Sequence, residues 1–393
     1  MKTIKIFSEV YYPDLISSGY YMTEISETLA KDHDVTVFCG GTNTKFHSEV
    51  RNKVKIVRFP LKNFNKNILY KRIIKFIHLS WKFYLIARKQ IGSNDEVICV
   101  TNPALFIPII SYLKKRRNFI LTFFIHDVFP DNLVATQILS SNNLIYKLLY
   151  KIYRLSFYRA NRIVTCGRDM KQYFELKLPN YNGEILSIPN WGDPKNICPN
   201  LALKKQTLHE FGITARMVFQ FAGNIGRGQG ITCLLQAATE VNHPDIQFLF
   251  FGEGVYEEKL KSMSTMNITY GGSFTRDESN KFLNACDVAI VSLQKGMYGL
   301  GVPSKTYNIL AAGKPILYIG EAKSEIGLLI QEYGLGRVCS SGNIESIKEG
   351  INWFLERSPA ELSELGQKSR TIAENNFSRE TITDFYSTIF RTS

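Results

Sequence analysis

The chain has 393 residues, is 45% hydrophobic and carries a formal net charge of +13. This length and composition suit two domains with separate cores and exclude a generally disordered chain. The seven Cys are scattered without metal-ligand spacing, so we expect reduced thiols, no metal and a cytoplasmic protein. Residues 1–193 hold 28 Lys and Arg against 15 Asp and Glu, whereas residues 194–393 hold 20 of each. We therefore expect the first half to meet an anionic partner.

Short apolar runs alternate with helical patterns through the first half of the chain. The runs are rarely interrupted by polar residues, which is typical of parallel strands buried on both faces. The predicted strands are 3–8, 34–40, 54–60, 96–100, 119–125 and 162–166, and helices are predicted between them, for example at 104–113 and 144–160. This order predicts a doubly wound α/β domain.

A linker is predicted at 188–200, a stretch with three Pro, one Gly and three Asn. After it the alternation restarts, with strands near 217–223, 246–252, 267–272, 287–293 and 315–320. The sequence therefore predicts two Rossmann-like α/β domains, 1–193 and 194–378. For the last residues, 379–393, we consider a helix that returns to the first domain.

The stretch GLGVPSKTYNILAAGKP, residues 299–315, predicts an anion site. Ser304 is a candidate N-cap and Gly313 a candidate stop, so we expect a helix from about Lys305 to Ala312. A helix N-terminus beside a Lys attracts anions. An ordinary connection from loop to helix to strand fits these residues equally well.

A second candidate anion site is the Gly-rich loop 223–230, which follows an apolar strand. Glycines let the backbone approach a phosphate, and Arg227 can bind a diphosphate with two hydrogen bonds. A plain tight turn is the alternative. Two such sites in one domain favour a ligand with two phosphates. Between them, Gly252 and Glu253 follow another strand, where Glu253 could bind a base or ribose or be a solvated turn residue.

In the first half, polar residues follow two apolar strands. His126 and Asp127 end the strand 119–125, Asp131 comes four residues later, and Glu9 follows the first strand. α/β enzymes place functional groups at the carboxyl ends of strands. A lone His is also common as a structural residue, and both interpretations stand on these residues alone.

Five motifs, which in chain order are IHDVFPD, IPNW, AGNIGRGQG, FFGEG and GLGVPSKTYNILAAGKP, together resemble glycosyltransferase family 4. Within that family the chain looks most like the transferases of N-acetylfucosamine type that assemble bacterial O-antigen and capsule repeats. The resemblance covers nearly the whole chain. It implies two facing Rossmann-like domains with a cleft between them, the type B architecture. It also implies a nucleotide sugar held by the C-terminal domain, retention of anomeric configuration and no required metal.

Carried over by position, the resemblance implies catalytic roles for His126, near the reacting sugar carbon, and for Lys305 and Arg227, at the diphosphate. The donor-binding residues that it implies are Ser18, Gly19, Gly223, Asn224, Gly226, Gln229, Gly252, Glu253, Pro303, Ser304, Tyr307 and Asn308. On the acceptor side we place Glu9, Asp127 and Asp131.

The sequence departs from the family in two places. The wider family commonly has an Arg and a Lys in the diphosphate loop, and this chain has Asn224 and Gln229 at those positions. The wider family also has two Glu separated by seven residues, and neither is present here. Asn308 occupies the later position. The earlier position is Leu300 if it is counted by spacing, or Gly296 if it is aligned by the Gly-aromatic-Gly pattern. Two alternatives stay open. A nucleotide-sugar epimerase of the same architecture would need additional acid/base residues in the cleft, whereas the missing Glu pair motivates a non-catalytic partner in glycan assembly. Nucleic-acid binding through the basic half is a further hypothesis, but the sequence contains no recognisable nucleic-acid-binding module.

The basic segment 67–90 predicts contact with an anionic membrane. Between Glu49 and Asp95 there are 12 Lys and Arg and no acidic residue. At about 100° per residue, one helical face carries the basic side chains and the opposite side is apolar. The basic face comprises Lys71, Lys75, His78, Lys82 and Lys89, and the apolar side Ile73, Phe76, Ile77, Trp81, Phe83 and Tyr84. With a lipid-linked glycan as acceptor, we expect a peripheral enzyme on the inner face of the membrane. A core helix with a solvated Lys face is the alternative.

Overall fold

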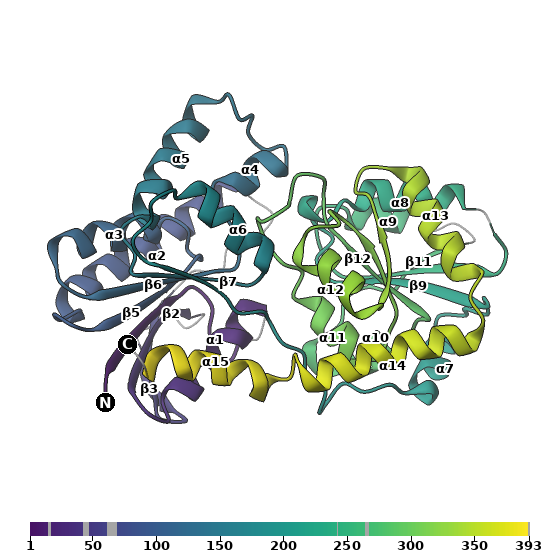
Figure 1. Cartoon of the computed structure of the whole chain (residues 1–393), viewed down its shortest axis with the longest axis horizontal. Coiled ribbons are helices and arrows are strands. Elements are labelled where there is room, and N and C mark those ends of the chain that lie inside the picture. Colours follow the sequence, from purple (N-terminus) through teal and green to yellow (C-terminus); the bar gives the residue numbers. More distant parts are fainter. Residues whose placement is uncertain (15–16, 42–46, 61–68, 242, 264–266, 392–393) are drawn as a thin grey trace. The chain divides into compact units, whose positions relative to one another are not determined.

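The computed structural model divides into two compact units, and it describes residues 1–14, 17–41, 47–60, 69–241, 243–263 and 267–391 (Figure 1). Unit 1 is Met1–Pro189 with Gly299–Gly301 and Thr383–Ser393, and unit 2 is Asn190–Tyr298 with Val302–Ile382. Each unit is a sheet with helices on both faces. The predicted class of two doubly wound α/β domains is thus confirmed.

The unit 1 sheet has eight strands in the order β3-β4-β2-β1-β5-β6-β7-β8. All neighbours pair in parallel except β3 and β4, which are antiparallel. The strands of unit 1 are β1 (Thr3–Ser8), β2 (Asp34–Gly41), β3 (His47–Arg51), β4 (Val54–Pro60), β5 (Glu96–Val100), β6 (Ile120–Ile125), β7 (Arg162–Thr165) and β8 (Glu184–Ser187). The helices are α1 (Ser17–Leu29), α2 (Leu69–Gln90), α3 (Phe106–Arg116), α4 (Asp131–Ala135), α5 (Leu144–Phe157) and α6 (Arg168–Lys177). Helix α15 (Arg379–Arg391) begins with residues of unit 2 and continues with residues of unit 1.

The unit 2 sheet has six parallel strands in the order β11-β10-β9-β12-β13-β14. Its strands are β9 (Met217–Ala222), β10 (Ile246–Phe251), β11 (Ile268–Tyr270), β12 (Val288–Ser292), β13 (Ile316–Ile319) and β14 (Gly336–Cys339). The helices are α7 (Leu201–Glu210), α8 (Ile231–Glu240), α9 (Glu257–Ser262), α10 (Ser279–Leu283), α11 (Lys305–Ala311), α12 (Glu325–Tyr333), α13 (Ile344–Leu355) and α14 (Pro359–Asn375), with short 3-10 turns η1 (Arg227–Gln229) and η2 (Arg276–Glu278).

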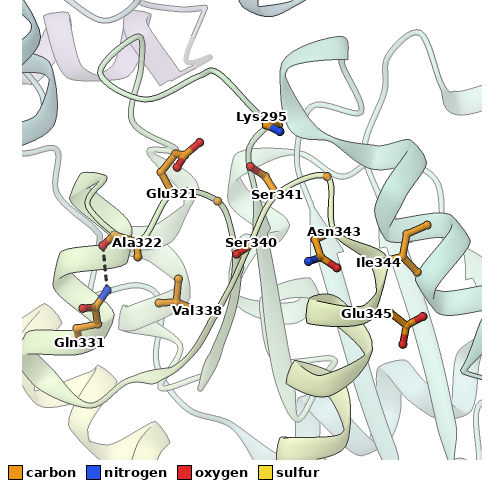
Figure 2. Close-up of a pocket in the computed structure, with 12 residues that line it drawn as sticks. Lys295, Glu321, Ala322, Gln331, Val338, Ser340, Ser341, Asn343, Ile344 and Glu345 are labelled. Carbon is orange, nitrogen blue, oxygen red and sulfur yellow. Dashed lines mark hydrogen bonds between the residues drawn. The ribbon is translucent and has the colours of Figure 1, made fainter.

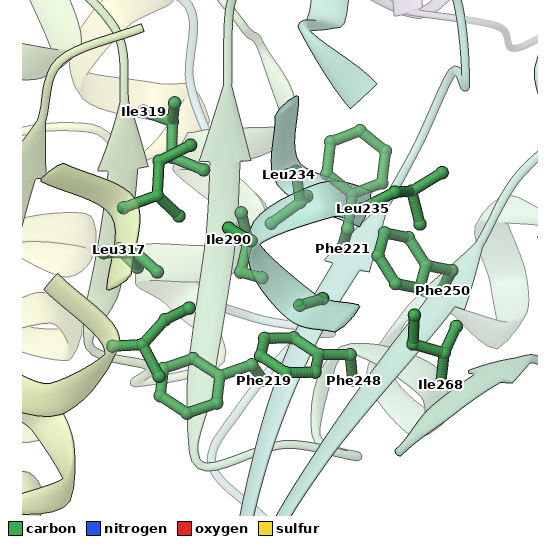
Figure 3. Packing of buried hydrophobic residues seen from close by; sticks show 14 of the residues in the cluster. Phe219, Phe221, Leu234, Leu235, Phe248, Phe250, Ile268, Ile290, Leu317 and Ile319 are labelled. Atoms are coloured by element: carbon green, nitrogen blue, oxygen red, sulfur yellow. The ribbon is translucent and has the colours of Figure 1, made fainter. Parts of the chain in front are cut away.

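The core of unit 2 shows why its strands read as unbroken apolar runs. Phe219 and Phe221 of β9 lie beside Phe248 and Phe250 of β10, and Leu234 of α8 packs over them (Figure 3). Because helices cover both faces of this parallel sheet, successive residues of a strand are buried on both sides and neither side faces solvent. The central strands could therefore be predicted from their unbroken apolar runs in the sequence.

Three strands escaped sequence prediction: β3, β8 and β14. Most of their residues are exposed or half-buried, since β3, β8 and β14 occupy sheet edges. An edge strand needs fewer apolar residues, so its sequence lacks the continuous run that marked the others.

Helix α2 has two apolar sides rather than one. Leu79, Phe83 and Ala87 are buried, whereas Ile77 and Trp81 are exposed. The predicted apolar side is therefore divided, and Phe83 belongs to the core. The side chains of Lys71 and Ile73 lie outside the described residues. Within the described part of the chain, no helix is both long and apolar enough to cross a bilayer.

Candidate functional site

The helix predicted at 305–312 is α11, which spans seven residues and follows β12. Ser304 precedes it in helical conformation and its side chain makes no capping hydrogen bond, so the prediction of a Ser304 cap was wrong. Gly313 ends the helix region with a φ of 63°, a left-handed conformation that favours glycine. The predicted anion site would therefore depend on Lys305 rather than on a capped helix end.

The side chain of Lys305 ends in a buried nitrogen that contacts an aromatic ring. Its Nζ is buried and has no hydrogen-bond acceptor among the described residues. The nitrogen lies 3.3 Å from the ring centroid of Phe221, near the end of β9. Burial holds the pKa of Lys305 well below its ordinary value. A cation in this position is unfavourable until an anion approaches it.

Two Gly loops pack directly against each other beside this lysine. A Cβ on Gly252 would lie 1.8 Å from the Gly223 carbonyl oxygen, and a Cβ on Gly254 would lie 2.4 Å from the Ile225 oxygen. The Ile225 amide donates to the Glu253 carbonyl at 2.8 Å. A Cβ on Gly223 would lie 3.1 Å from Lys305 Cδ. Glycine at these positions therefore lets two backbones and the lysine stem meet at one point.

The loop continues through Gly226 and the turn η1 to Gly230, which has a φ of 60° and precedes α8. The Gly228 carbonyl accepts a hydrogen bond from the Gln294 amide, at 2.8 Å. This bond ties the loop to the segment that follows β12. Arg227 and Asn224 are exposed and Gln229 is half-buried, so all three are accessible to a ligand.

The remaining donor-side residues fall into two groups. Pro303 and Ser304 are half-buried, and the exposed Glu253 accepts a hydrogen bond from the Ser273 hydroxyl at 3.0 Å. In contrast, Tyr307 is fully buried and its ring packs against Phe377. The interpretation of Tyr307 as a nucleoside contact is therefore replaced by a packing role.

Asn308 anchors the start of unit 2. Its Oδ1 accepts a hydrogen bond from the Asp193 amide at 3.0 Å. A neutral amide oxygen is sufficient to accept this hydrogen bond. Asn308, which stands where the family has Glu, therefore has a structural role in holding the backbone at Asp193.

His126 follows β6 directly, as the sequence indicated. Its amide donates to Thr101 Oγ1 at 3.3 Å, and its Nδ1 lies 3.4 Å from Cys166 Sγ. Nε2 is buried and has no partner among the described residues. Burial lowers the pKa of His126 to about 4, so the ring is neutral near pH 7. The Nε2 atom of a neutral imidazole can donate or accept one hydrogen bond with a ligand, depending on the tautomer, but the ring supplies no positive charge.

Asp127 and Val128 hold the segment Gly299–Gly301. Asp127 forms an isolated antiparallel bridge with Gly301, and the Val128 amide donates to the Leu300 carbonyl at 3.0 Å. The Gly299 amide approaches Asp169 Oδ2 at 3.4 Å. The backbone after His126 is thereby linked to the segment that leads into α11.

Asp131 was predicted to lie on the acceptor side, but its carboxylate is buried and fully engaged. It forms an ion pair with Lys177 and accepts hydrogen bonds from Tyr173, at 2.6 Å, and from Tyr146, at 3.3 Å. These partners come from α5 and α6, so Asp131 connects α4 to both helices. We therefore reassign it as a structural residue.

Glu9, Ser18 and Gly19 are also placed by contacts within unit 1. Glu9 pairs with Lys75 of α2 at 2.8 Å. Ser18 is half-buried in the first turn of α1. A Cβ on Gly19 would lie 2.2 Å from the Asp14 carbonyl oxygen, so the fold itself requires glycine there.

A cavity of about 1020 Å³ in unit 2 contains none of the predicted site residues (Figure 2). It lies beyond the ends of β13 and β14, where the Gln331 side chain donates to the Ala322 carbonyl at 2.9 Å. Its charged lining residues are Lys295, Glu321 and Glu345. Two carboxylates against one cation do not favour the binding of a phosphate in this cavity.

Sequence reasoning missed several neighbours of the predicted residues. Phe221 beneath Lys305 and Cys166 beside His126 are both distant in sequence from the groups they touch. Neither carries a motif, because an apolar strand residue and a buried thiol look like ordinary core.

Two α/β units of this kind have the type B fold found in glycosyltransferases such as WaaG. Residues 18–196 match the family described as Glycosyltransferase Family 4, and residues 210–372 match Glycosyl transferases group 1. The chain belongs to glycosyltransferase family 4.

Two relatives match nearly the whole length of the chain. WbjE of Pseudomonas aeruginosa, named as a glycosyltransferase, is 32% identical over 383 residues, which is 96% of this chain and 95% of WbjE. WcaI of Escherichia coli (strain K12), named for colanic acid biosynthesis, is 22% identical over 413 residues, covering 97% and 99%. Among solved structures, Anabaena HepE in complex with UDP-glucose has a TM-score of 0.72 at 12% identity, with 100% of both chains covered.

Proposed function

We propose that this glycosyltransferase moves a sugar from a UDP-linked donor to a lipid-linked glycan, with retention of configuration, in bacterial surface polysaccharide synthesis. The name of WcaI and the resemblance to O-antigen and capsule transferases support the pathway class. HepE, a structural neighbour, binds UDP-glucose. An N-acetylated deoxyhexosamine is the sugar class that the resemblance favours.

The observation that carries the proposal is the unpartnered ammonium of Lys305 beside Gly223. A buried cation needs a counter-charge, and a diphosphate supplies one that the described residues do not. Arg227 is exposed on the same Gly-rich loop and can add a second positive group. We propose that these two residues neutralise the diphosphate without a metal.

In the proposed reaction, the bond between the sugar anomeric carbon and the diphosphate oxygen breaks, and a bond to the acceptor hydroxyl oxygen forms. The acceptor hydroxyl passes its proton to an oxygen of the departing diphosphate. Negative charge grows on the departing UDP, where the Lys305 ammonium stabilises it. His126 holds the donor sugar through a hydrogen bond at Nε2, and it forms no covalent bond to the sugar.

The test is a thermal-shift screen of nucleotides and nucleotide sugars, followed by transfer of radiolabel to a lipid extract. The true donor should raise the melting temperature, since a ligand that binds only the folded state stabilises it. Label in the lipid fraction with retained configuration by NMR supports the proposal. Interconversion of the free nucleotide sugar would instead indicate an epimerase. UDP-sugar binding without either product would indicate a non-catalytic partner.

We also propose that the enzyme is peripheral on an anionic membrane, with α2 as one contact. Lys82 and Lys89 remain accessible on the predicted basic face, whereas Lys75 is engaged by Glu9. Basic residues near anionic lipid contribute about 1 kcal/mol each. Changing Lys82 and Lys89 to Glu should therefore lower recovery with anionic vesicles in flotation. Equal recovery of the variant and the wild type would exclude this contact.

A further inference from the structure

Helix α5 of unit 1 exposes a continuous ridge of aliphatic side chains, which we call the α5 ridge. Leu144 is 81% exposed and Leu148 is 60% exposed. The spacing of the ridge residues places them along one side of the helix. The α5 ridge consists of Leu144, Ile145, Leu148, Ile152 and Leu155.

The same helix is already packed through its other side. Tyr153, Ser156 and Phe157 are buried, and the Tyr153 hydroxyl donates to the Ala104 carbonyl at 2.8 Å. The ridge therefore does not serve to attach α5 to its own unit. Five large aliphatic residues on one outer surface indicate a contact with something apolar.

The charged side chains of α5 and of its neighbours α2 and α3 are all basic. Lys147 and Lys151 of α5 are exposed beside it. No Asp or Glu occurs in α2, α3 or α5, whereas α2 carries six Lys and Arg and α3 and α5 carry three each. Combined apolar and basic surfaces of this kind suit the boundary between lipid headgroups and acyl chains.

The three helices belong to one layer. α3 packs against both α2 and α5 on the same side of the unit 1 sheet (Figure 1). α2 has an outward apolar row of its own, and Trp81 within it is a residue type that prefers membrane interfaces. The row comprises Ile74, Ile77, Trp81 and Leu85.

We propose that the α5 ridge inserts into the surface of an anionic lipid bilayer, as a second anchor beside α2. A second copy of this chain is the less favourable occupant, because a two-fold contact would place these basic helices against one another. The inference deepens the membrane part of the proposed function. It does not depend on glycosyl transfer, since vesicles can bind the enzyme without donor or acceptor.

The experiment is flotation of the full chain with vesicles of phosphatidylcholine alone or with 30 mol% phosphatidylglycerol (about a third anionic lipid, enough for a strong surface potential). The test variant is Leu144→Gln with Leu148→Gln. The control is Leu176→Gln with Leu201→Gln, because these leucines of α6 and α7 are also exposed, at 77% and 64%. A third variant, Lys147→Gln with Lys151→Gln, tests the electrostatic part.

We expect the leucine variant to lower the partition coefficient on anionic vesicles on the order of tenfold. The control should bind like the wild type, and the lysine variant should weaken the salt dependence. Wild-type binding by the leucine variant would overturn the proposal. A concentration-dependent dimer of the wild type that the leucine variant dissociates, with vesicle binding unchanged, would assign the ridge to self-association instead. The UDP thermal shift, measured on each variant, reports separately on the transferase proposal.

Discussion

Replacing Lys305 by Met should stabilise the free protein while it weakens the enzyme. Met has nearly the same length, and it would place its thioether over the Phe221 ring, now 3.3 Å from the ammonium. The substitution removes a buried charge without a partner, and a sulfur–aromatic contact adds about 0.3–1.5 kcal/mol. We expect a gain of about 2 kcal/mol in the free energy of unfolding, which corresponds to a rise of roughly 4–8 °C in melting temperature.

Function should change in the opposite direction. A charge-assisted hydrogen bond to a diphosphate contributes roughly 1.5–3 kcal/mol, so UDP affinity should fall roughly 10- to 150-fold. Turnover should fall more than donor affinity, because the charge on the diphosphate is greatest as UDP departs. Differential scanning fluorimetry, calorimetric titration with UDP and steady-state kinetics measure the three quantities.

Lys314→Met is the matched control. Lys314 is also a buried lysine of unit 2, but its Nζ donates to the carbonyls of Asn284, at 3.1 Å, and Cys286, at 3.0 Å. Its replacement removes both of these hydrogen bonds and should lower the melting temperature without changing UDP affinity. A Lys305→Met protein that melts below the wild type, or that binds UDP normally, would refute the reasoning.

Three further predictions concern the other residues. The pKa of His126 in the folded protein, about 4, lies below its unfolded value of 6.5. As the pH falls, the unfolded chain therefore takes up a proton before the folded protein does. The free energy of unfolding should fall between pH 6.5 and pH 4 by up to roughly 3 kcal/mol. Urea titrations at several pH values should show that His126→Gln flattens this decline. Asp131→Asn leaves Lys177 buried without its carboxylate and should lower stability by roughly 3 kcal/mol. Adding Lys177→Met should restore most of it, and loss of turnover in that stable double variant would return Asp131 to the active site. Gly223→Ala forces a φ of 140° on a residue whose Cβ would meet Lys305 Cδ at 3.1 Å, so UDP binding should be lost. Gly272→Ala, with a φ of 80° and no neighbour within 4 Å, should keep UDP binding, and equal effects of the two substitutions would point to backbone strain alone.

The sequence by itself determined the fold class, the central strands and the order of the motifs. Parallel strands such as β9 and β10 are buried on both faces, so their positions are visible as apolar runs. The loops that follow them, with His126, Gly223 and Gly252, could be located because function in such sheets collects at the carboxyl ends of strands. Edge strands such as β3 carried no comparable signal.

Only the tertiary structure decided which of the candidate residues are available. Lys177 lies 46 residues from Asp131, and Phe377 lies 70 residues from Tyr307, so the contacts that remove Asp131 and Tyr307 from the surface depend on how the chain folds back. The same is true of Lys305, whose nitrogen is buried over Phe221 and has no hydrogen-bond acceptor in the part of the chain that the structure describes. Periodicity gave α2 a single apolar side, but the packing of α3 against it buries Phe83 and leaves Trp81 exposed. Sequence patterns report which residue types recur along an element, whereas burial and pairing depend on long-range contacts that those patterns do not encode.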